Sequence, residues 1–186
     1  MQVAENAGGR LEGATYIASP NYDARPVGTV IDTLVIHAIS LPPGDYGSPD
    51  IQQLFCNQLQ SDGHSFYPEI AGLTVSAHLL IRRDGQVIQF VPFDARAWHA
   101  GVSELHGRNR VNDFSIGIEL EGSDYAPFED AQYLTLAATT RALLAAYPQI
   151  AADRIVGHID IAPQRKRDPG PYFNWLRYRE DLASAT

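Results

Sequence analysis

The sequence predicts an α+β domain, in which a central mixed β-sheet is flanked by helices. Three observations favour this mixed α/β class. Several short apolar runs are typical of strands, and two longer segments have helical periodicity. The two kinds of segment are mixed along the chain rather than strictly alternating. The chain has 186 residues, the length of one domain, and contains neither internal repeats nor low-complexity tracts.

An irregular arm over residues 1–28 is the first expected segment, because it is rich in Gly, Ala, Asn and Pro. The folded domain is expected over 29–183. Its first strand is predicted at 33–40, TLVIHAIS, where aliphatic residues are followed by Pro42-Pro43-Gly44. Ser48-Pro49 then predicts a helix start, since a hydroxyl residue precedes a proline at the first helical position.

The middle of the chain predicts a hairpin and a central strand. Asp84-Gly85 lies between two apolar runs, 77–82 and 86–91, which is the strongest short hairpin signal. In the strand FSIGIELE, 114–121, apolar residues alternate with Ser, Gly and two Glu residues. Small side chains beside Glu119 are expected to leave space above the polar face of that strand.

The C-terminal third predicts two helices around a short strand and a loop. A helix is expected over 129–147, where Pro148 ends it, and a strand over 154–158. Residues 159–172 contain three prolines and are expected to form a loop. A last helix is predicted over 173–183.

Composition and charge narrow the possible functions. The 14 basic and 22 acidic residues give a net charge of −8, which favours neither nucleic acid nor an anionic membrane as a partner. Cys56 is the single cysteine, so neither an intramolecular disulfide nor a thiolate zinc cluster is expected. No secretory signal and no apolar stretch near 18 residues is present, so we expect a cytoplasmic protein, and we expect a monomer.

Two histidines and one aspartate offer a set of zinc ligands. His37 and His158 each close an apolar run, and Asp168 follows ten residues after His158 in the loop RKRDPGP. Two imidazoles and one carboxylate are typical of a catalytic zinc site with an open fourth position. The spacing by itself leaves open that His158 is a hydrogen-bonded loop histidine.

Three further residues are candidates for chemistry or binding. Lys166 is the only lysine beside 13 arginines, which indicates a need for a compact charge, although a solvated surface lysine fits equally. Glu119 can act as a general base if its strand face lines a cleft; otherwise it is an exposed carboxylate. Trp98, beside His99, can line a binding site for a sugar or a peptide; otherwise it closes the edge of the hydrophobic core.

Four motifs give the chain a resemblance to a known family. LVIHAISLPPG, VSAHLLIRRDGQVIQFVPFDARAWHAG, NDFSIGIELEG and GHIDIAPQRKRDPGP resemble the cytosolic 1,6-anhydro-N-acetylmuramyl-L-alanine amidases of peptidoglycan recycling. These belong to the superfamily of zinc amidases and peptidoglycan recognition proteins. The resemblance implies one Zn²⁺ per chain bound by His37, His158 and Asp168. It also implies that Glu119 is the catalytic carboxylate and that Lys166 assists at the oxyanion.

The resemblance also implies positions that bind substrate. Arg110 matches a residue at the anhydromuramyl end of the substrate. Ala38 stands where the family usually has Asn, Thr74 where an Arg is common, and Phe66 where a Tyr is common. Two of these departures, Ala38 and Thr74, fall on positions that contact substrate in the family, so we expect them to alter substrate affinity rather than zinc chemistry.

The implied reaction is hydrolysis of the amide between the muramyl lactyl group and L-alanine of the stem peptide, on a soluble anhydromuropeptide. Zinc activates the attacking water, Glu119 moves its proton and Lys166 stabilises the oxyanion. Two alternatives remain: a lytic amidase that acts on intact cell wall, and a binding module without catalysis. The second requires loss of a ligand or of the catalytic carboxylate, and this sequence retains all of them.

Overall fold

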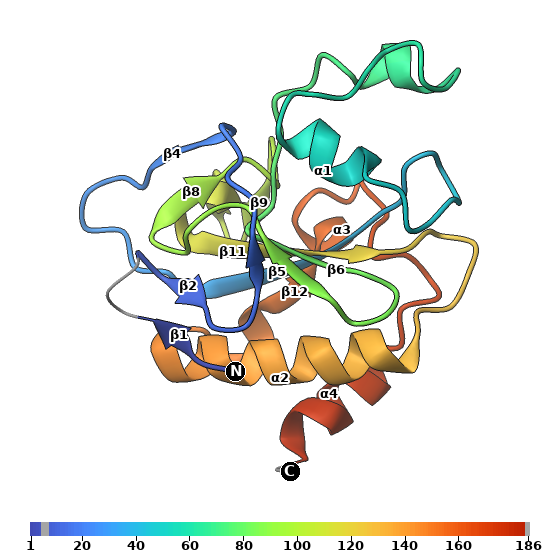
Figure 1. Ribbon diagram of the computed structural model, residues 1–186. Coiled ribbons are helices and arrows are strands. Elements are labelled where there is room, and N and C mark those ends of the chain that lie inside the picture. Colours follow the sequence, from blue (N-terminus) through green and yellow to red (C-terminus); the bar gives the residue numbers. More distant parts are fainter. Residues whose placement is uncertain (5–7, 185–186) are drawn as a thin grey trace.

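A six-stranded mixed sheet forms the centre of the computed structural model, which describes residues 1–4 and 8–184 (Figure 1). Its strand order is β12-β5-β11-β6-β7-β3. The bounds are Ile155–Gly157 for β12, Thr33–Ile39 for β5, Ser115–Glu121 for β11, Leu79–Ile81 for β6, Val87–Gln89 for β7 and Thr15–Tyr16 for β3. All neighbours are parallel except β6 and β7, which are antiparallel. The predicted α+β class with a mixed central sheet is confirmed.

Local signals predicted the centre of this sheet correctly. β6 and β7 form the hairpin expected around Asp84-Gly85, where Gly85 has a φ of 85°. β5, β11 and β12 lie within the three predicted strand segments. Because β11 pairs in parallel with both β5 and β6, it lies in the middle of the sheet.

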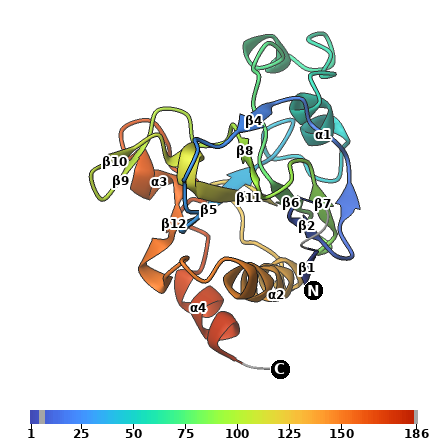
Figure 2. The ribbon, with the colours of Figure 1, turned by 90° about the vertical axis from the view of Figure 1, so that its left-hand side faces the viewer.

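The apolar face of the sheet packs against two helices. α2, Asp130–Ala146, and α4, Trp175–Ala183, lie together below the sheet in Figures 1 and 2. The alternate residues Ile116, Ile118 and Leu120 of β11 are fully or almost fully buried in the core between the sheet and these helices. A strand with one aliphatic and one polar face therefore leaves the polar face for the opposite side of the sheet.

Helix α1, Asp50–Phe55, and the segment that follows it lie on that opposite side (Figure 1). Short strand pairs frame the same side: β4, Tyr22–Ala24, with β8, Ala95–Ala97, and β9, Glu104–Leu105, with β10, Arg108–Asn109. Three single-turn 3₁₀ helices cover Tyr67–Glu69, Val111–Phe114 and Ala152–Arg154. Of the three turns, Val111–Phe114 leads directly into β11 and Ala152–Arg154 leads directly into β12.

The N-terminal segment differs from the irregular arm expected over residues 1–28. Its described part contains β1, Val3–Ala4, β2, Arg10–Leu11, and the strands β3 and β4, while residues 5–7 lie outside the described part. Ser19 and Asn21 are buried and bond the carbonyl oxygen of Phe55. Strands of two or three residues are too short to produce a periodic signal, so the sequence did not reveal them.

The segment expected as a loop over 159–172 also differs, because its first residues belong to a short helix, α3, His158–Ile161. The carboxylate of Asp160 caps this turn by accepting from the Gly157 amide at 2.7 Å. His158 is therefore the first residue of a helical turn rather than the last residue of a strand. None of the helices described here is long and apolar enough to cross a membrane.

Candidate metal and catalytic site

Three neighbouring strands carry the candidate residues to one edge of the sheet. Strands β12, β5 and β11 are adjacent and parallel, so their carboxyl ends meet. His37 in β5 and Glu119 in β11 are direct register partners and project from the same face. His158 follows the end of β12, and the chain then turns through α3 and returns with Asp168. Its carbonyl oxygen accepts from the Ile159 amide at 3.0 Å.

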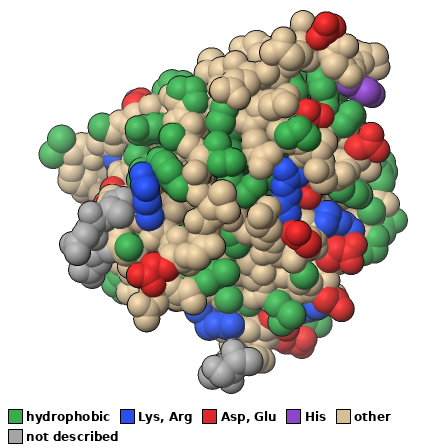
Figure 3. All heavy atoms as spheres, in the orientation of Figure 1, with side chains coloured by type: hydrophobic (Ala, Val, Ile, Leu, Met, Phe, Trp, Pro, Cys, Tyr) green, Lys and Arg blue, Asp and Glu red, His purple; other side chains and the backbone are tan. Residues whose placement is uncertain are grey.

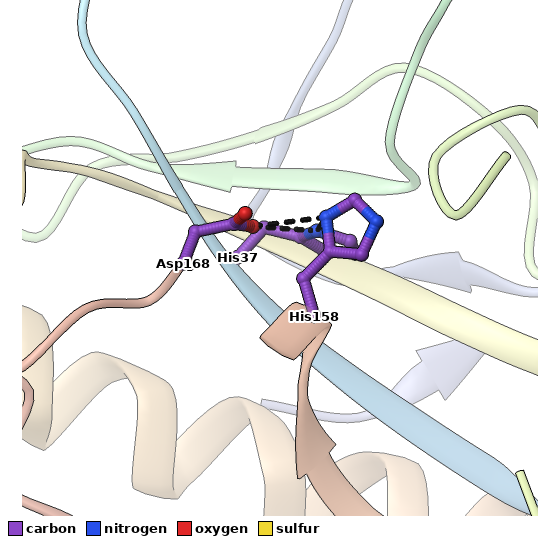
Figure 4. Close-up of side chains that lie close together, drawn as sticks. All are labelled: His37, His158 and Asp168. Carbon is purple, nitrogen blue, oxygen red and sulfur yellow. Dashed lines mark hydrogen bonds and ion pairs between the residues drawn. The ribbon is translucent and has the colours of Figure 1, made fainter. Parts of the chain in front are cut away.

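His37, His158 and Asp168 converge as the resemblance implied (Figure 4). The Nδ1 atoms of the two histidines are 2.9 Å apart. The Oδ2 atom of Asp168 lies 3.1 Å from the Nδ1 of His37 and 3.0 Å from the Nδ1 of His158. Both histidines are buried, with 1% and 3% of their side chains exposed, whereas Asp168 is partly exposed. The three atoms thus form a compact, nearly equilateral triangle with one side toward solvent.

The chemistry of this triangle fits a cation. The Nε2 atom of His158 faces the carbonyl oxygen of Ala100 at 3.3 Å, and a carbonyl can only accept. A neutral His158 therefore carries its proton on Nε2 and its lone pair on Nδ1, toward the triangle. Imidazole lone pairs and a carboxylate that face one another at about this distance are the donor set of a catalytic zinc site.

Burial controls the protonation of His37. It lowers the pKa of His37 to about 4, so the ring is neutral at pH 7 and available as a ligand. A neutral imidazole is the protonation state in which a histidine binds a metal ion.

The two glutamates of β11 have different surroundings. Glu121 is 1% exposed, and its carboxylate accepts from Arg82 at 2.7 Å, from the Gly47 amide at 2.7 Å and from the Arg83 amide at 3.2 Å. The Oε2 atom of Glu119 is buried and has no hydrogen-bond partner within the described part of the chain. Burial, and then the charge of Asp168, raise the pKa of Glu119 well above its ordinary value, while Lys166 opposes them. A buried carboxylate with a raised pKa is a candidate for general acid–base catalysis.

A cavity of about 320 Å³ opens beside the triangle and collects most of the candidate residues. Glu119, Lys166, His158 and Asp168 line it, together with Ala38 and Trp98. Arg110 does not line this cavity. It is 70% exposed, lies 3.2 Å from Asp113 and lines an adjoining hollow that shares Trp98 with the cavity. The geometry therefore places Glu119, Lys166 and two members of the triangle around one cavity.

The family model for N-acetylmuramoyl-L-alanine amidases matches residues 27–171, which is most of the chain. The chain belongs to this family of amidases. The 1,6-anhydro-N-acetylmuramyl-L-alanine amidase AmpD of Escherichia coli K12 is 58% identical over 96% of this chain and 97% of its own length. The same enzyme of Haemophilus influenzae is 51% identical over 91% and 92% of the two chains. The resemblance read from the four motifs is thereby confirmed.

Solved structures agree with this membership. A crystal structure of an AmpD derivative superposes with a TM-score of 0.93 at 53% identity, over 98% of this chain and 99% of that one. The amidase AmiD of Escherichia coli, solved with anhydro-N-acetylmuramic acid-L-Ala-D-γ-Glu-L-Lys, has a TM-score of 0.63 at 32% identity. That match covers 87% of this chain and 62% of AmiD.

Sequence reasoning missed two features of this amidase site. The space expected above the small residues of β11 is filled, because the ring of His99 lies directly over Gly117. A Cβ atom at position 117 would come within 2.5 Å of the His99 ring. The second feature is an apolar wall of the cavity, which is formed by Leu41, Phe66, Ile70 and Leu73. Gly117 beside Glu119 was a signal for the first feature. For the apolar wall, the resemblance pointed to Phe66, but nothing in the sequence linked Ile70 and Leu73 to the site.

Thr74 does not line the cavity, although its neighbours Val75 and Ser76 do. Phe66 lines it, and the adjacent Tyr67 is turned away and donates to Asp50 at 2.6 Å. The cavity of this amidase therefore has an apolar ring at the position where the resemblance implied a tyrosine. Charged side chains of both signs are interspersed on the face shown in Figure 3, and no basic patch dominates that face.

Proposed function

We propose that this amidase hydrolyses the amide between the lactyl group of 1,6-anhydro-N-acetylmuramic acid and L-alanine of the stem peptide. The proposed substrate is a soluble anhydromuropeptide in the cytoplasm, and the proposed role is peptidoglycan recycling. The observation that carries the proposal is the buried Oε2 atom of Glu119, which has no hydrogen-bond partner among the described residues and lies in one cavity with Lys166, His158 and Asp168. The high identity to 1,6-anhydro-N-acetylmuramyl-L-alanine amidases over nearly the full chain supports this choice of substrate.

His37, His158 and Asp168 are proposed to hold one Zn²⁺ per chain. The donor set suits zinc in hydrolases and also Fe(II) in oxygenases. Amide hydrolysis transfers no electrons, so membership in an amidase family favours zinc. When bound, zinc supplies a Lewis acid that lowers the pKa of water and polarises a carbonyl group.

The chain's own residues would then move the protons and stabilise charge. Glu119 accepts the proton of the attacking water at its free carboxylate oxygen and passes it to the leaving nitrogen of L-alanine. Lys166 places its ammonium where the carbonyl oxygen becomes negative. Its neighbours in the loop are engaged elsewhere: Arg165 bonds the Ala100 and Val102 carbonyls, and Arg167 pairs with Asp124.

The reaction can be tested by product analysis in ¹⁸O-labelled water. We expect anhydromuramyl-tripeptide to give a free tripeptide and anhydromuramic acid, with the label only in the new lactyl carboxylate. Intact sacculi serve as the second substrate and are expected to release little peptide. Faster release from sacculi than from the soluble substrate would instead favour the lytic amidase, and binding of anhydromuramyl-tripeptide without turnover would favour the binding module.

Lys166 gives a prediction that separates catalysis from a surface role. Lys166→Ala is expected to lower kcat by about 10²–10³-fold, because losing one oxyanion donor costs that much in other enzymes. KM should change little, since the interaction forms chiefly in the transition state. Lys166→Arg keeps the charge but replaces a compact ammonium with a planar fork, so we expect a loss of about tenfold or more.

Arg167→Ala is the matched control, because it removes an exposed charge from the same loop. It should leave kcat and zinc content unchanged. Steady-state kinetics and metal analysis on the three variants decide the role of Lys166. Full activity in both Lys166 variants would assign Lys166 to the solvated surface.

A further inference from the structure

Nε2 of His37, the ring nitrogen that faces away from the metal triangle, starts a chain of hydrogen bonds that leads away from the triangle. His37 Nε2 lies 2.9 Å from Nδ1 of His99. His99 Nε2 lies 3.1 Å from Oγ of Ser115, and that oxygen lies 2.6 Å from the carbonyl oxygen of Val111. Four groups from β5, the loop after β8, β11 and the preceding 3₁₀ turn are thus joined in series.

Only one arrangement of protons satisfies this chain. The carbonyl of Val111 cannot donate, so the hydroxyl proton of Ser115 must lie between the two oxygens. Ser115 Oγ then accepts, and the proton that it accepts is on Nε2 of His99. Since a neutral imidazole carries one proton, Nδ1 of His99 accepts from Nε2 of His37. The lone pair of His37 is thereby left on Nδ1, the atom that faces Asp168 and His158.

The ring of His99 is also fixed sterically and through its backbone. It rests on the bare Cα of Gly117, because a Cβ there would approach its Cγ to 2.5 Å and its Nδ1 to 2.6 Å. The side-chain oxygen of Asn112 accepts from the backbone amides of His99 and Ala100 at 3.2 and 2.8 Å. Ala100 is the residue whose carbonyl oxygen faces Nε2 of His158. Two consecutive residues therefore face the outer nitrogens of both histidines in the triangle.

We infer that His99, oriented by Ser115 and seated on Gly117, is a positioning residue that keeps the lone pair of His37 on Nδ1. This role rests on the proposed metal site, and it adds a residue that is neither a ligand nor in the predicted catalytic set. Partners of this kind fix the orientation of metal-binding histidines and typically account for about 10–100-fold in metal affinity.

A pair of substitutions at position 99 separates the hydrogen bond from packing. His99→Asn retains an acceptor oxygen that can take the His37 Nε2 proton, whereas His99→Leu fills the space without an acceptor. His106→Asn, at an exposed histidine, is the control for the loss of an imidazole. Gly117→Ala displaces the His99 ring without removing any polar group from the chain.

The first measurement needs neither a variant nor metal. Long-range ¹H–¹⁵N NMR of the metal-free wild type is expected to show His37 protonated on Nε2. The second measurement is zinc affinity by competition with a chromophoric chelator. We expect His99→Leu and Gly117→Ala to bind zinc about 10–100-fold more weakly than the wild type, and His99→Asn and His106→Asn to remain close to it.

Two results would overturn the inference: protonation of His37 on Nδ1 in the metal-free wild type, or equal zinc affinity in the Leu and Asn variants. If His99→Leu fails to fold, Gly117→Ala and the wild-type NMR signals still decide. Failure of the proposed function would give a different result. The wild type would then show His37 protonated on Nε2 and yet bind no zinc at the triangle.

Discussion

Glu119→Gln is expected to reduce kcat by about 10²–10⁴-fold, the range that general acid–base catalysis contributes. The amide cannot accept the proton of the attacking water, and Glu119→Ala should be equally inactive. Zinc content should not change, because Glu119 is not a member of the metal triangle. The metal-free Gln variant should be at least as stable as the wild type, since the change removes the charge of a buried carboxylate whose Oε2 has no partner among the described residues.

Glu121→Gln is the control from the same strand and the same face, with the opposite expectation. Glu121 and Arg82 form a buried ion pair, so weakening one partner is expected to lower the free energy of unfolding, by up to about 3–5 kcal/mol. Turnover per folded molecule should stay near the wild-type value. Denaturant unfolding and steady-state kinetics on both variants test this contrast. Near wild-type kcat in Glu119→Gln would remove Glu119 from the mechanism.

Asp168→Ala is expected to abolish activity by a different route, the loss of the metal. The substitution removes one of three ligand atoms, so the fall in zinc affinity should exceed the roughly 10–100-fold typical of an outer-shell partner. Added zinc should restore part of the activity of Asp168→Ala and none of the activity of Glu119→Gln. Equal zinc affinity in Asp168→Ala and the wild type would contradict the ligand assignment.

How much of the fold was predictable depended on the length of each signal. The alternation of β11 and the Asp84-Gly85 turn act locally, so the polar strand face and the hairpin follow from the residues themselves. The strands of the N-terminal segment have two or three residues, and β3 and β4 pair with distant partners, such as Thr15 with Ile88 and Tyr22 with Ala97. No local pattern encodes such pairing.

The candidate site also combines features that local patterns predict with features that depend on contacts between distant residues. The alternation of β11 puts Glu119 on the polar face, but it does not distinguish Glu119 from Glu121, because the donors to Glu121 come from residues 47, 82 and 83. His37 and His158 are 121 positions apart, so their spacing could not predict that they lie at one site. The family motifs predicted it. His99 escaped both kinds of reasoning, since its partners Ser115 and Gly117 become its neighbours only when the loop after β8 packs on β11.

The location of the metal tests the central claim most directly. Crystals of the zinc-loaded protein, measured at the zinc absorption edge, should give one anomalous peak per chain. We predict that peak at about 2.0–2.2 Å from Nδ1 of His37, Nδ1 of His158 and a carboxylate oxygen of Asp168. A fully occupied zinc peak at any other position, with none at this triangle, would contradict the account.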